Sequence, residues 1–302
     1  MRPAVTLLEP FRALFYAPFY VAEARGAFAR QGLEVRLETA GTPDAAAQRL
    51  LAGEADLAWS GPMRPMLMRS QDAACPLRSF CAVVMRDPFL LVGRAPRPGF
   101  ALADLRGLSL GLVSEVPTPV WCLEDDLRRA GLDPAGLDRR RGLTMAENAQ
   151  AVTEGALDVA QLFEPFACRV EDAGGAVWHA QASRGPTAYT AFYATEAALA
   201  EKRDAFRAMI RAMAEALAWM RDAAPEAIAE AIAPRFAEVP ADHRTRAMAR
   251  YQSLGIWPAD PRFPRAAFDR LGEAMVSSGV MAAIPPFDAC VDTAIAEEAL
   301  RG

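Results

Sequence analysis

Lysine and histidine are scarce in this chain, and their scarcity excludes several kinds of catalytic chemistry. The one lysine among the 302 residues is Lys202, which lies in a polar helical stretch, so a Schiff-base mechanism has little support. The two histidines, His179 and His243, have no aspartate, serine or cysteine partner close in sequence. Neither a metal site nor a catalytic triad is therefore visible, and we expect no metal ion, no cofactor and no catalytic residue of these kinds.

Cysteine pairs with metal-site or redox-site spacing are also missing. The five cysteines, none of them in a CxxC pair, are Cys75, Cys81, Cys122, Cys168 and Cys290. An odd number of thiols is unusual in an exported protein. We therefore expect small, buried apolar side chains, and the count favours a reducing compartment.

An excess of positive charge and long apolar runs are absent as well. The 33 lysines and arginines face 38 aspartates and glutamates, for a net charge of −5, which argues against nucleic acid and anionic membranes as partners. No apolar run of about 18 residues exists, so we expect no membrane insertion. Strand-like sequence begins at Ala4 and leaves no room for a signal peptide. The chain as written is expected in the cytoplasm, and in the periplasm if an export segment was removed from it.

The most informative pattern that is present is a repeat. The pattern apolar-x-x-Gly-x-x-Asp-apolar-Ala occurs at residues 50–58 and again at 152–160. Each copy follows a threonine, Thr42 or Thr144, that suits a helix N-cap. In the second copy Glu147 completes a capping box.

The segments upstream of the two copies are matched too. Residues 28–34 parallel residues 127–133, because in both a helical stretch ends at a glycine and a strand follows. The chain therefore builds one supersecondary unit twice. Two similar α/β lobes imply a cleft between them, and such clefts are where small ligands bind.

We predict an α/β fold with two lobes, each a mixed sheet flanked by helices, and a ligand cleft between the lobes. The second lobe, residues 91–187, is an insertion between two crossover strands. The first lobe takes residues 1–90 and 188–302, including a helical C-terminal extension that has no partner in the repeat. Hinge crossovers are expected near residues 86–94 and 184–192.

Motifs spread over nearly the whole chain resemble those of the type II periplasmic solute-binding proteins of ABC importers. The branch is the one that contains thiamine-pyrimidine-precursor, sulfonate, taurine and nitrate binders, with the yeast-type pyrimidine synthases as relatives. The matching stretches are Phe19-Tyr20-Val21-Ala22, Gly26-x-Phe28, Gly32-Leu33-Glu34-Val35, residues 50–58, Leu102-Ala103-Asp104-Leu105-Arg106-Gly107, Gly155 to Asp158, Glu164-Pro165, and Tyr251-Gln252-x-Leu254-Gly255-Ile256-Trp257. The resemblance implies a two-lobed protein that clamps a small molecule by hinge closure. We expect a monomer with an ABC permease as its partner.

Ligands of open α/β sheets bind beyond the carboxyl ends of strands, close to helix N-termini. The aromatic turn after the first strand offers Phe11, Phe15 and Tyr16 there. These rings either stack on a flat ligand or belong to the core. The resemblance favours the first, because in the matching family this turn faces the cleft.

Three carboxylates and one arginine lie at strand ends or in the loops that follow them. Glu9, Glu115 and Glu164 can accept hydrogen bonds from an amine or an aminopyrimidine, or else they are solvated groups or helix caps. Arg12 is a candidate partner for a carboxylate, sulfonate or phosphate. An ordinary surface role is the more common one for an arginine in a chain with so many.

The remaining candidates are small or hydroxyl-bearing residues at strand–helix junctions. Thr42 is first an N-cap, and Thr118 with Pro119 repeats that helix start, so each hydroxyl either caps a helix or also touches ligand. Ser60 and Gly61 precede another helix in the same way.

The leading function hypothesis is a non-catalytic binding protein for a small polar or aromatic-heterocyclic metabolite. Acidic cleft residues beside aromatic rings favour a pyrimidine-precursor-like ligand. Sulfonate-like, taurine-like and aromatic-acid ligands stay open.

Two alternatives come from other classes. Some relatives without export signals are enzymes, and a cytosolic lyase of a small organic acid would use Glu9 or Glu164 as its base. The pyrimidine-synthase reaction has little support, because those enzymes carry a lysine, a histidine and a cysteine-rich motif, and this chain has no lysine before Lys202 and no cysteine cluster. A cytosolic sensor that closes on ligand and signals to a partner is the third hypothesis.

Overall fold

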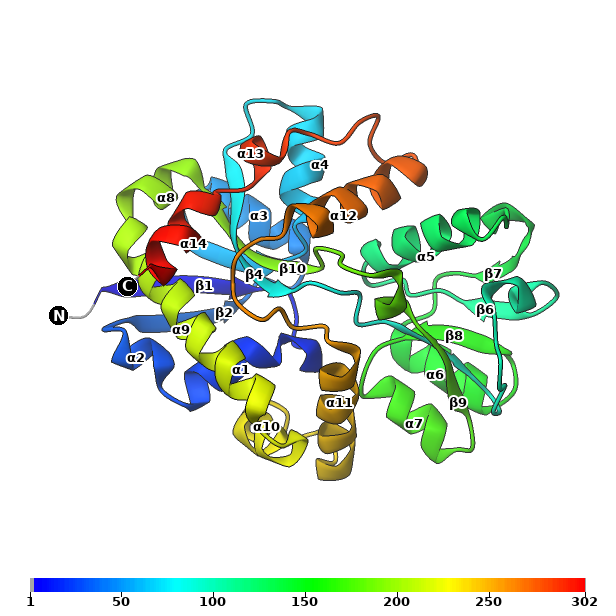
Figure 1. The fold of residues 1–302 in the computed structure, drawn as a ribbon. Helices are drawn as coiled ribbons and strands as arrows, with labels where there is room; N and C mark the ends of the chain where they lie inside the picture. Colours follow the sequence, from blue (N-terminus) through cyan, green and yellow to red (C-terminus); the bar gives the residue numbers. More distant parts are fainter. Residues whose placement is uncertain (1–2, 302) are drawn as a thin grey trace.

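The described part of the chain, residues 3–301 of a computed structural model, forms two lobes that lie side by side (Figure 1). Each lobe is built on one five-stranded sheet, with the strand order β2-β1-β3-β10-β4 in the first and β7-β6-β8-β5-β9 in the second. The first sheet contains β1 Ala4–Glu9, β2 Glu34–Thr39, β3 Leu57–Ser60, β4 Leu77–Val84 and β10 Thr190–Thr195. The second contains β5 Leu90–Gly93, β6 Ser109–Gly111, β7 Asp138–Arg140, β8 Val159–Leu162 and β9 Ala176–Ala180. The predicted two-lobed α/β fold is confirmed.

Strand pairing shows that the two sheets share one topology. In the first sheet β1 is parallel to both β2 and β3, and in the second β6 is parallel to both β7 and β8. The strand that completes the core of each sheet, β10 or β5, is antiparallel to its neighbours. The chain crosses between the sheets twice, at residues 85–89 and at residues 181–189. The duplication inferred from the repeat is therefore present in the topology.

The repeated aspartate does the same task in both lobes. Asp56 Oδ2 accepts a hydrogen bond from the Thr6 N–H at 2.7 Å, and Asp158 Oδ2 accepts one from the Ser109 N–H at 3.0 Å. Each carboxylate thus ties the loop before one strand to the neighbouring parallel strand. The Ser109 N–H is also the main reason why the pKa of Asp158 lies below its ordinary value.

The repeated glycine ends the helix before this aspartate, and it requires a left-handed backbone. Gly53 has φ 72° and Gly155 has φ 76°, a region that costs other residues about 1–2 kcal/mol. We expect Gly155→Ala to lower the free energy of unfolding by about that amount, measured by urea denaturation. Gly136→Ala is the control, because Gly136 is also exposed and has no positive φ. Equal stabilities of the two variants would contradict this account.

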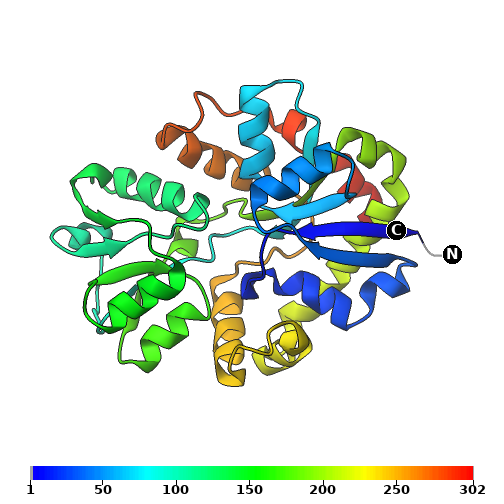
Figure 2. The same cartoon turned by 180° about the vertical axis from the view of Figure 1, so that it is seen from behind.

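Helices flank both sheets (Figures 1 and 2). The first lobe carries α1 Ala17–Ala24, α2 Ala27–Arg30, α3 Pro43–Leu51, α4 Met63–Gln71, α8 Glu196–Glu201, α9 Arg203–Asp222, α10 Pro225–Ile232, α11 Ala241–Leu254, α12 Arg265–Ser277, α13 Phe287–Cys290 and α14 Thr293–Leu300. The second carries α5 Thr118–Arg129, α6 Met145–Thr153 and α7 Phe166–Asp172. Short 3-10 turns are η1 Leu14–Tyr16, η2 Leu102–Leu105, η3 Pro134–Gly136, η4 Gln181–Arg184 and η5 Ala233–Arg235. Within residues 3–301, none of these helices has the length and apolar character that a membrane span needs.

The C-terminal extension packs mainly on the first lobe. Helix α9 lies against α1 and α2, and α14 lies against β4. Two helices of the extension also reach the second lobe, because α11 contacts α7 and α12 contacts α5. Figure 1 shows these two helices on opposite sides of the crossover segments.

The predicted helix starts hold at two of three threonines. Thr42 Oγ1 accepts a hydrogen bond from the Ala45 N–H, and Thr144 forms the predicted capping box with Glu147. Thr118 is not a cap: Pro117 already has helical backbone angles and takes the N-cap position, so Thr118 is the first residue of α5. Its hydroxyl is therefore left without a capping role.

Candidate functional site

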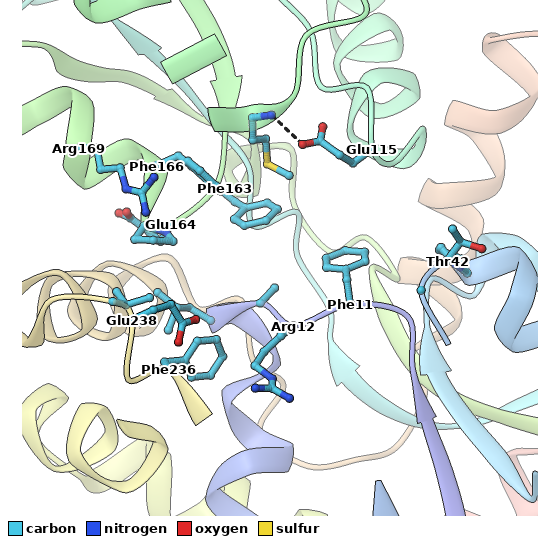
Figure 3. Close-up of a pocket in the computed structure, with 17 residues that line it drawn as sticks. Phe11, Arg12, Thr42, Glu115, Phe163, Glu164, Phe166, Arg169, Phe236 and Glu238 are labelled. Carbon is cyan, nitrogen blue, oxygen red and sulfur yellow. Dashed lines mark hydrogen bonds between the residues drawn. The ribbon is translucent and has the colours of Figure 1, made fainter. Parts of the chain in front are cut away.

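A cavity of about 390 Å³ lies between the two lobes, at the carboxyl ends of the parallel strands (Figure 3). The first lobe contributes the loops after β1 and β2 and the segment after η5, and the second contributes the loops before α5, α6 and α7. The lining residues are Phe11, Arg12, Ala13, Leu14, Gly41, Thr42, Pro43, Glu115, Met145, Phe163, Glu164, Pro165, Phe166, Arg169, Phe236, Glu238 and Val239.

Aromatic rings from both lobes form the walls of this cavity. Phe11 and Phe236 come from the first lobe, and Phe163 and Phe166 come from the second (Figure 3). Behind the wall, Phe15 packs edge-on against Phe163, with ring centroids 5.3 Å apart. Flat or apolar ligand parts would therefore meet rings on both sides when the lobes are together.

Three carboxylates line the cavity: Glu238 is exposed, and Glu115 and Glu164 are already engaged by the protein. Glu115 accepts the Met145 N–H at 2.7 Å and the Ser114 N–H at 3.2 Å, so its negative charge lies at the N-terminus of α6. Glu164 is fully buried, pairs with Arg250, and accepts the Cys168 N–H at 3.1 Å. Burial raises the pKa of Glu164 above its ordinary value, although the Arg250 charge opposes that rise.

The positive charges of the site lie at its rim. Arg12 is exposed, and its guanidinium is 3.3 Å from Glu9. Arg169 is exposed on the other lobe and pairs with no carboxylate of residues 3–301. Its guanidinium stacks on Phe166, with Cζ 5.0 Å from the ring centroid. One guanidinium of each lobe is thus near the opening.

A second compartment of about 30 Å³ adjoins the cavity beyond Phe11 and Pro43. Its walls carry the hydroxyl-bearing residues Tyr16, Ser60, Thr118 and Tyr189, together with Gly61, Met63, Arg64, Val116 and Pro117. Helices α4 and α5 begin here, and neither has a capping side chain. The volume suits one water molecule or a small polar group of a ligand.

Nine of the eleven residues that the sequence suggested line one of the two compartments. Glu9 and Phe15 line neither, because both lie behind the surface in the first lobe. The Glu9 carboxylate accepts the Tyr20 hydroxyl at 2.7 Å and the Thr39 hydroxyl at 3.0 Å. Phe15 is part of the aromatic core described above.

The sequence did not point to six lining residues of α6, α7 and the C-terminal extension, namely Met145, Phe166, Arg169, Phe236, Glu238 and Val239. Phe236 and Glu238 follow η5, in a part of the chain that has no counterpart in the repeat. Met145 is the first residue of α6, directly after its cap, and Arg169 is exposed in the last turn of α7. An aromatic residue in a polar, proline-flanked segment, as at Phe236, was the one available signal.

One group of side chains has the spacing of a metal site, and it lies outside the cavity. Within residues 3–301, Asp172, Asp242 and His243 offer three ligand atoms within 4.8 Å of one another. Arg246 Nη1 lies 2.5 Å from Asp172 Oδ1, so this carboxylate already has a cationic partner. The guanidinium charge opposes a divalent cation, and we assign no metal to the cluster.

Comparisons with known proteins agree on the family and the fold. A family described as NMT1/THI5 like matches residues 15–227. The Bacillus subtilis (strain 168) protein YtlA, by name a candidate binding protein, is 27% identical over 299 residues, which cover 97% of this chain and 89% of YtlA.

Two solved structures show the same fold over almost the whole chain. The periplasmic aliphatic sulphonate binding protein SsuA of Escherichia coli has a TM-score of 0.74 and 15% identity and covers 95% of each chain. A zinc-bound ligand binding component of an ABC-type import system from Staphylococcus aureus has a TM-score of 0.73 and 16% identity and covers 99% of each chain. The predicted periplasmic-binding-protein fold is confirmed by both.

Proposed function

Because the chain belongs to the NMT1/THI5-like family, we propose that it is a solute-binding protein that closes two lobes on a small molecule and serves an ABC importer. The observation that carries the proposal is the interlobe cavity, whose aromatic walls come from both lobes. An ABC permease is supported as the partner because two proteins of the same fold are named as parts of ABC transport systems, one from Staphylococcus aureus and one a sulfonate-binding SsuA protein. We propose residues 1–90 with 188–302, and residues 91–187, as the two moving units, and a monomer as the working form.

For the ligand, we propose an apolar or aromatic molecule that carries one anionic group. The sequence favoured a pyrimidine-like ligand because of its acidic residues. In the structure Glu115 and Glu164 already accept hydrogen bonds from the protein, Glu9 lies outside the cavity, and the third lining carboxylate, Glu238, is exposed to solvent. The unpaired Arg169 guanidinium at the rim instead favours a carboxylate or sulfonate. SsuA, which has the same fold, is named as a sulphonate binder.

A thermal-shift screen followed by calorimetry tests both parts of the proposal. The compounds are benzenesulfonate, octanesulfonate, benzoate and 4-aminopyrimidine. A ligand at 100 times its Kd stabilises the folded protein by about 2.7 kcal/mol, which is easily seen as a rise in Tm. We expect the anions to raise the Tm. A rise with 4-aminopyrimidine alone would contradict the anionic class, and no rise with any compound of these classes would contradict the binding function.

Arg169 gives a more specific expectation. Arg169→Ala should weaken the binding of benzenesulfonate about tenfold, which corresponds to about 1.4 kcal/mol for the loss of one charge-assisted contact. Calorimetry at low and high salt measures it, since screening should shrink the difference. Arg106→Ala is the control, because Arg106 is an exposed arginine of the same lobe and lies outside both compartments. Equal weakening by both variants would argue for a general charge effect.

The lyase alternative loses its two candidate bases in this geometry. Glu9 lines neither compartment, and Glu164 is held by a guanidinium and a backbone N–H. A general base must reach the proton that it abstracts and have a free lone pair toward it.

A further inference from the structure

We infer that Arg250 and Tyr251 of α11 are positioning residues, which hold the ligand-facing turn of the second lobe against the first lobe and so couple closure to binding. Helix α11 belongs to the first lobe, where it packs on α10 and η1. It contacts α7 of the second lobe, and it binds Glu164 in the turn before α7. The inference rests on the proposed function in one respect, namely that the lobes open and close.

The contacts of these two neighbouring residues converge on one cavity-lining residue. The Arg250 guanidinium pairs with the Glu164 carboxylate, and the Tyr251 hydroxyl accepts the Glu164 N–H at 3.0 Å. Glu164 lies between Phe163 and Pro165, which also line the cavity (Figure 3). Both the side chain and the backbone of this turn are therefore bound to a helix of the opposite lobe.

A row of charges on the same face of α11 extends the contact. Arg250 Nη2 lies 2.7 Å from both carboxylate oxygens of Glu171, and one turn earlier Arg246 pairs with Glu171 at 2.8 Å and with Asp172 at 2.5 Å. His243 Nε2 lies 2.5 Å from Asp172. Residues 243, 246 and 250 are spaced by three and four, so they share one helix face.

Removing Arg250 and removing Arg246 would leave different carboxylates without a cationic partner. Glu164 is fully buried, so without Arg250 its charge has no cationic partner, and the turn that carries it loses one contact with the first lobe. Arg246 pairs with Glu171 and Asp172, which are partly or largely exposed and can be solvated instead. Opening of the lobes at the crossovers would break all these pairs, but only the Arg250 and Tyr251 contacts end at the cavity wall.

The test reads the closure of the ligand-free protein directly. Spin labels at Gln48→Cys on α3 and Ala146→Cys on α6 flank the cavity from opposite lobes, and both positions are exposed. The five native cysteines are all buried, so labelling is confined to the introduced ones. Distance distributions by pulsed electron spin resonance should show a mainly short distance in the parent. Arg250→Ala should move at least half of the molecules to a longer distance.

Arg246→Ala is the matched control, and it should leave the distribution close to that of the parent. Tyr251→Phe removes one hydroxyl and should give a smaller shift than Arg250→Ala. Arg250→Lys keeps a positive charge beside the buried carboxylate but cannot pair with Glu164 and Glu171 through two separate nitrogens, so it should shift the distribution partway. This variant also keeps the test decisive if Arg250→Ala does not fold. In a Glu164→Gln background the effect of Arg250→Ala should shrink, because no buried charge then needs the guanidinium.

The same variants are titrated with benzenesulfonate, and Arg250→Ala should weaken its binding at least tenfold. An unchanged distance distribution in folded Arg250→Ala and Arg250→Lys would overturn the inference, and so would an equal shift in Arg246→Ala. If no variant and no parent binds any compound of the screen, the proposed function fails, while the distances of the ligand-free protein still decide whether α11 holds the lobes together.

Discussion

Replacing Arg184 by methionine is expected to lower the free energy of unfolding by about 3 kcal/mol, because two buried carboxylates lose their most buried cation and keep only the more exposed Arg129 and Arg270. Arg184 ends η4 in the second crossover, and its side chain is only 1% exposed. Its guanidinium donates to Asp126 at 3.1 Å, to Asp125 at 3.0 Å and to the Thr187 hydroxyl at 2.9 Å. The variant thus removes the centre of a charge network that joins the crossover to α5.

Urea denaturation with tryptophan fluorescence measures this loss, and Arg129→Met is its matched control. Arg129 also pairs with Asp125, at 2.9 Å, but its side chain is 49% exposed, so its loss should cost less than about 1 kcal/mol. Neutralising Asp125 and Asp126 as asparagines in the Arg184→Met background should recover part of the stability. A loss below about 1 kcal/mol for Arg184→Met, equal to that of the control, would show that these carboxylates are stabilised in another way.

The parts of the fold that sequence reasoning predicted are those set by local signals that occur twice. The left-handed glycine and the carboxylate that binds the neighbouring strand each lie within a short segment, and both copies fold alike at Asp56 and Asp158. Thr42 and Thr144 cap helices for the same local reason. Because the repeat predicted two similar units, it also predicted two sheets and a ligand cleft between them.

The parts that sequence reasoning did not predict depend on contacts between distant segments. Phe236 reaches the cavity because α10 and η5 place it beside Tyr20 of α1, a contact that no local pattern encodes. The placement of Glu9 away from the cavity depends on the hydroxyls of Tyr20 and Thr39. The pairing of Glu164 with Arg250 joins residues of opposite lobes. Residue type and spacing indicate which polar groups lie at strand ends, but not which distant residue forms a hydrogen bond or ion pair with each of them.

The first crossover carries a second buried group with an unusual titration. Asp87 is fully buried, and its carboxylate accepts the Phe89 N–H and the Gln181 side-chain amide, each at 2.9 Å. Burial raises the pKa of Asp87 to about 7, and the Phe89 hydrogen bond and the Arg184 charge oppose that rise. Protonated Asp87 is therefore the form that the folded protein prefers through most of the range from about pH 4 to pH 7.

Asp87→Asn is expected to flatten the pH dependence of stability between pH 5 and pH 8. Because the pKa of Asp87 is higher in the folded than in the unfolded chain, its contribution to stability is complete below the unfolded pKa and is lost as the pH rises through about 7. The parent should lose about 2–3 kcal/mol over this interval relative to the variant, since each pKa unit corresponds to about 1.4 kcal/mol. Urea denaturation at pH 5, 6, 7 and 8 measures the difference, in which the titration of all shared groups cancels.

Asp138→Asn is the control, because the Arg140 hydrogen bond lowers the pKa of that exposed carboxyl and keeps its titration below the interval. Parallel curves for the parent and Asp87→Asn would mean that the Asp87 carboxylate is ionised in the folded protein already at pH 5, so that the crossover holds a full negative charge beside Arg184 throughout.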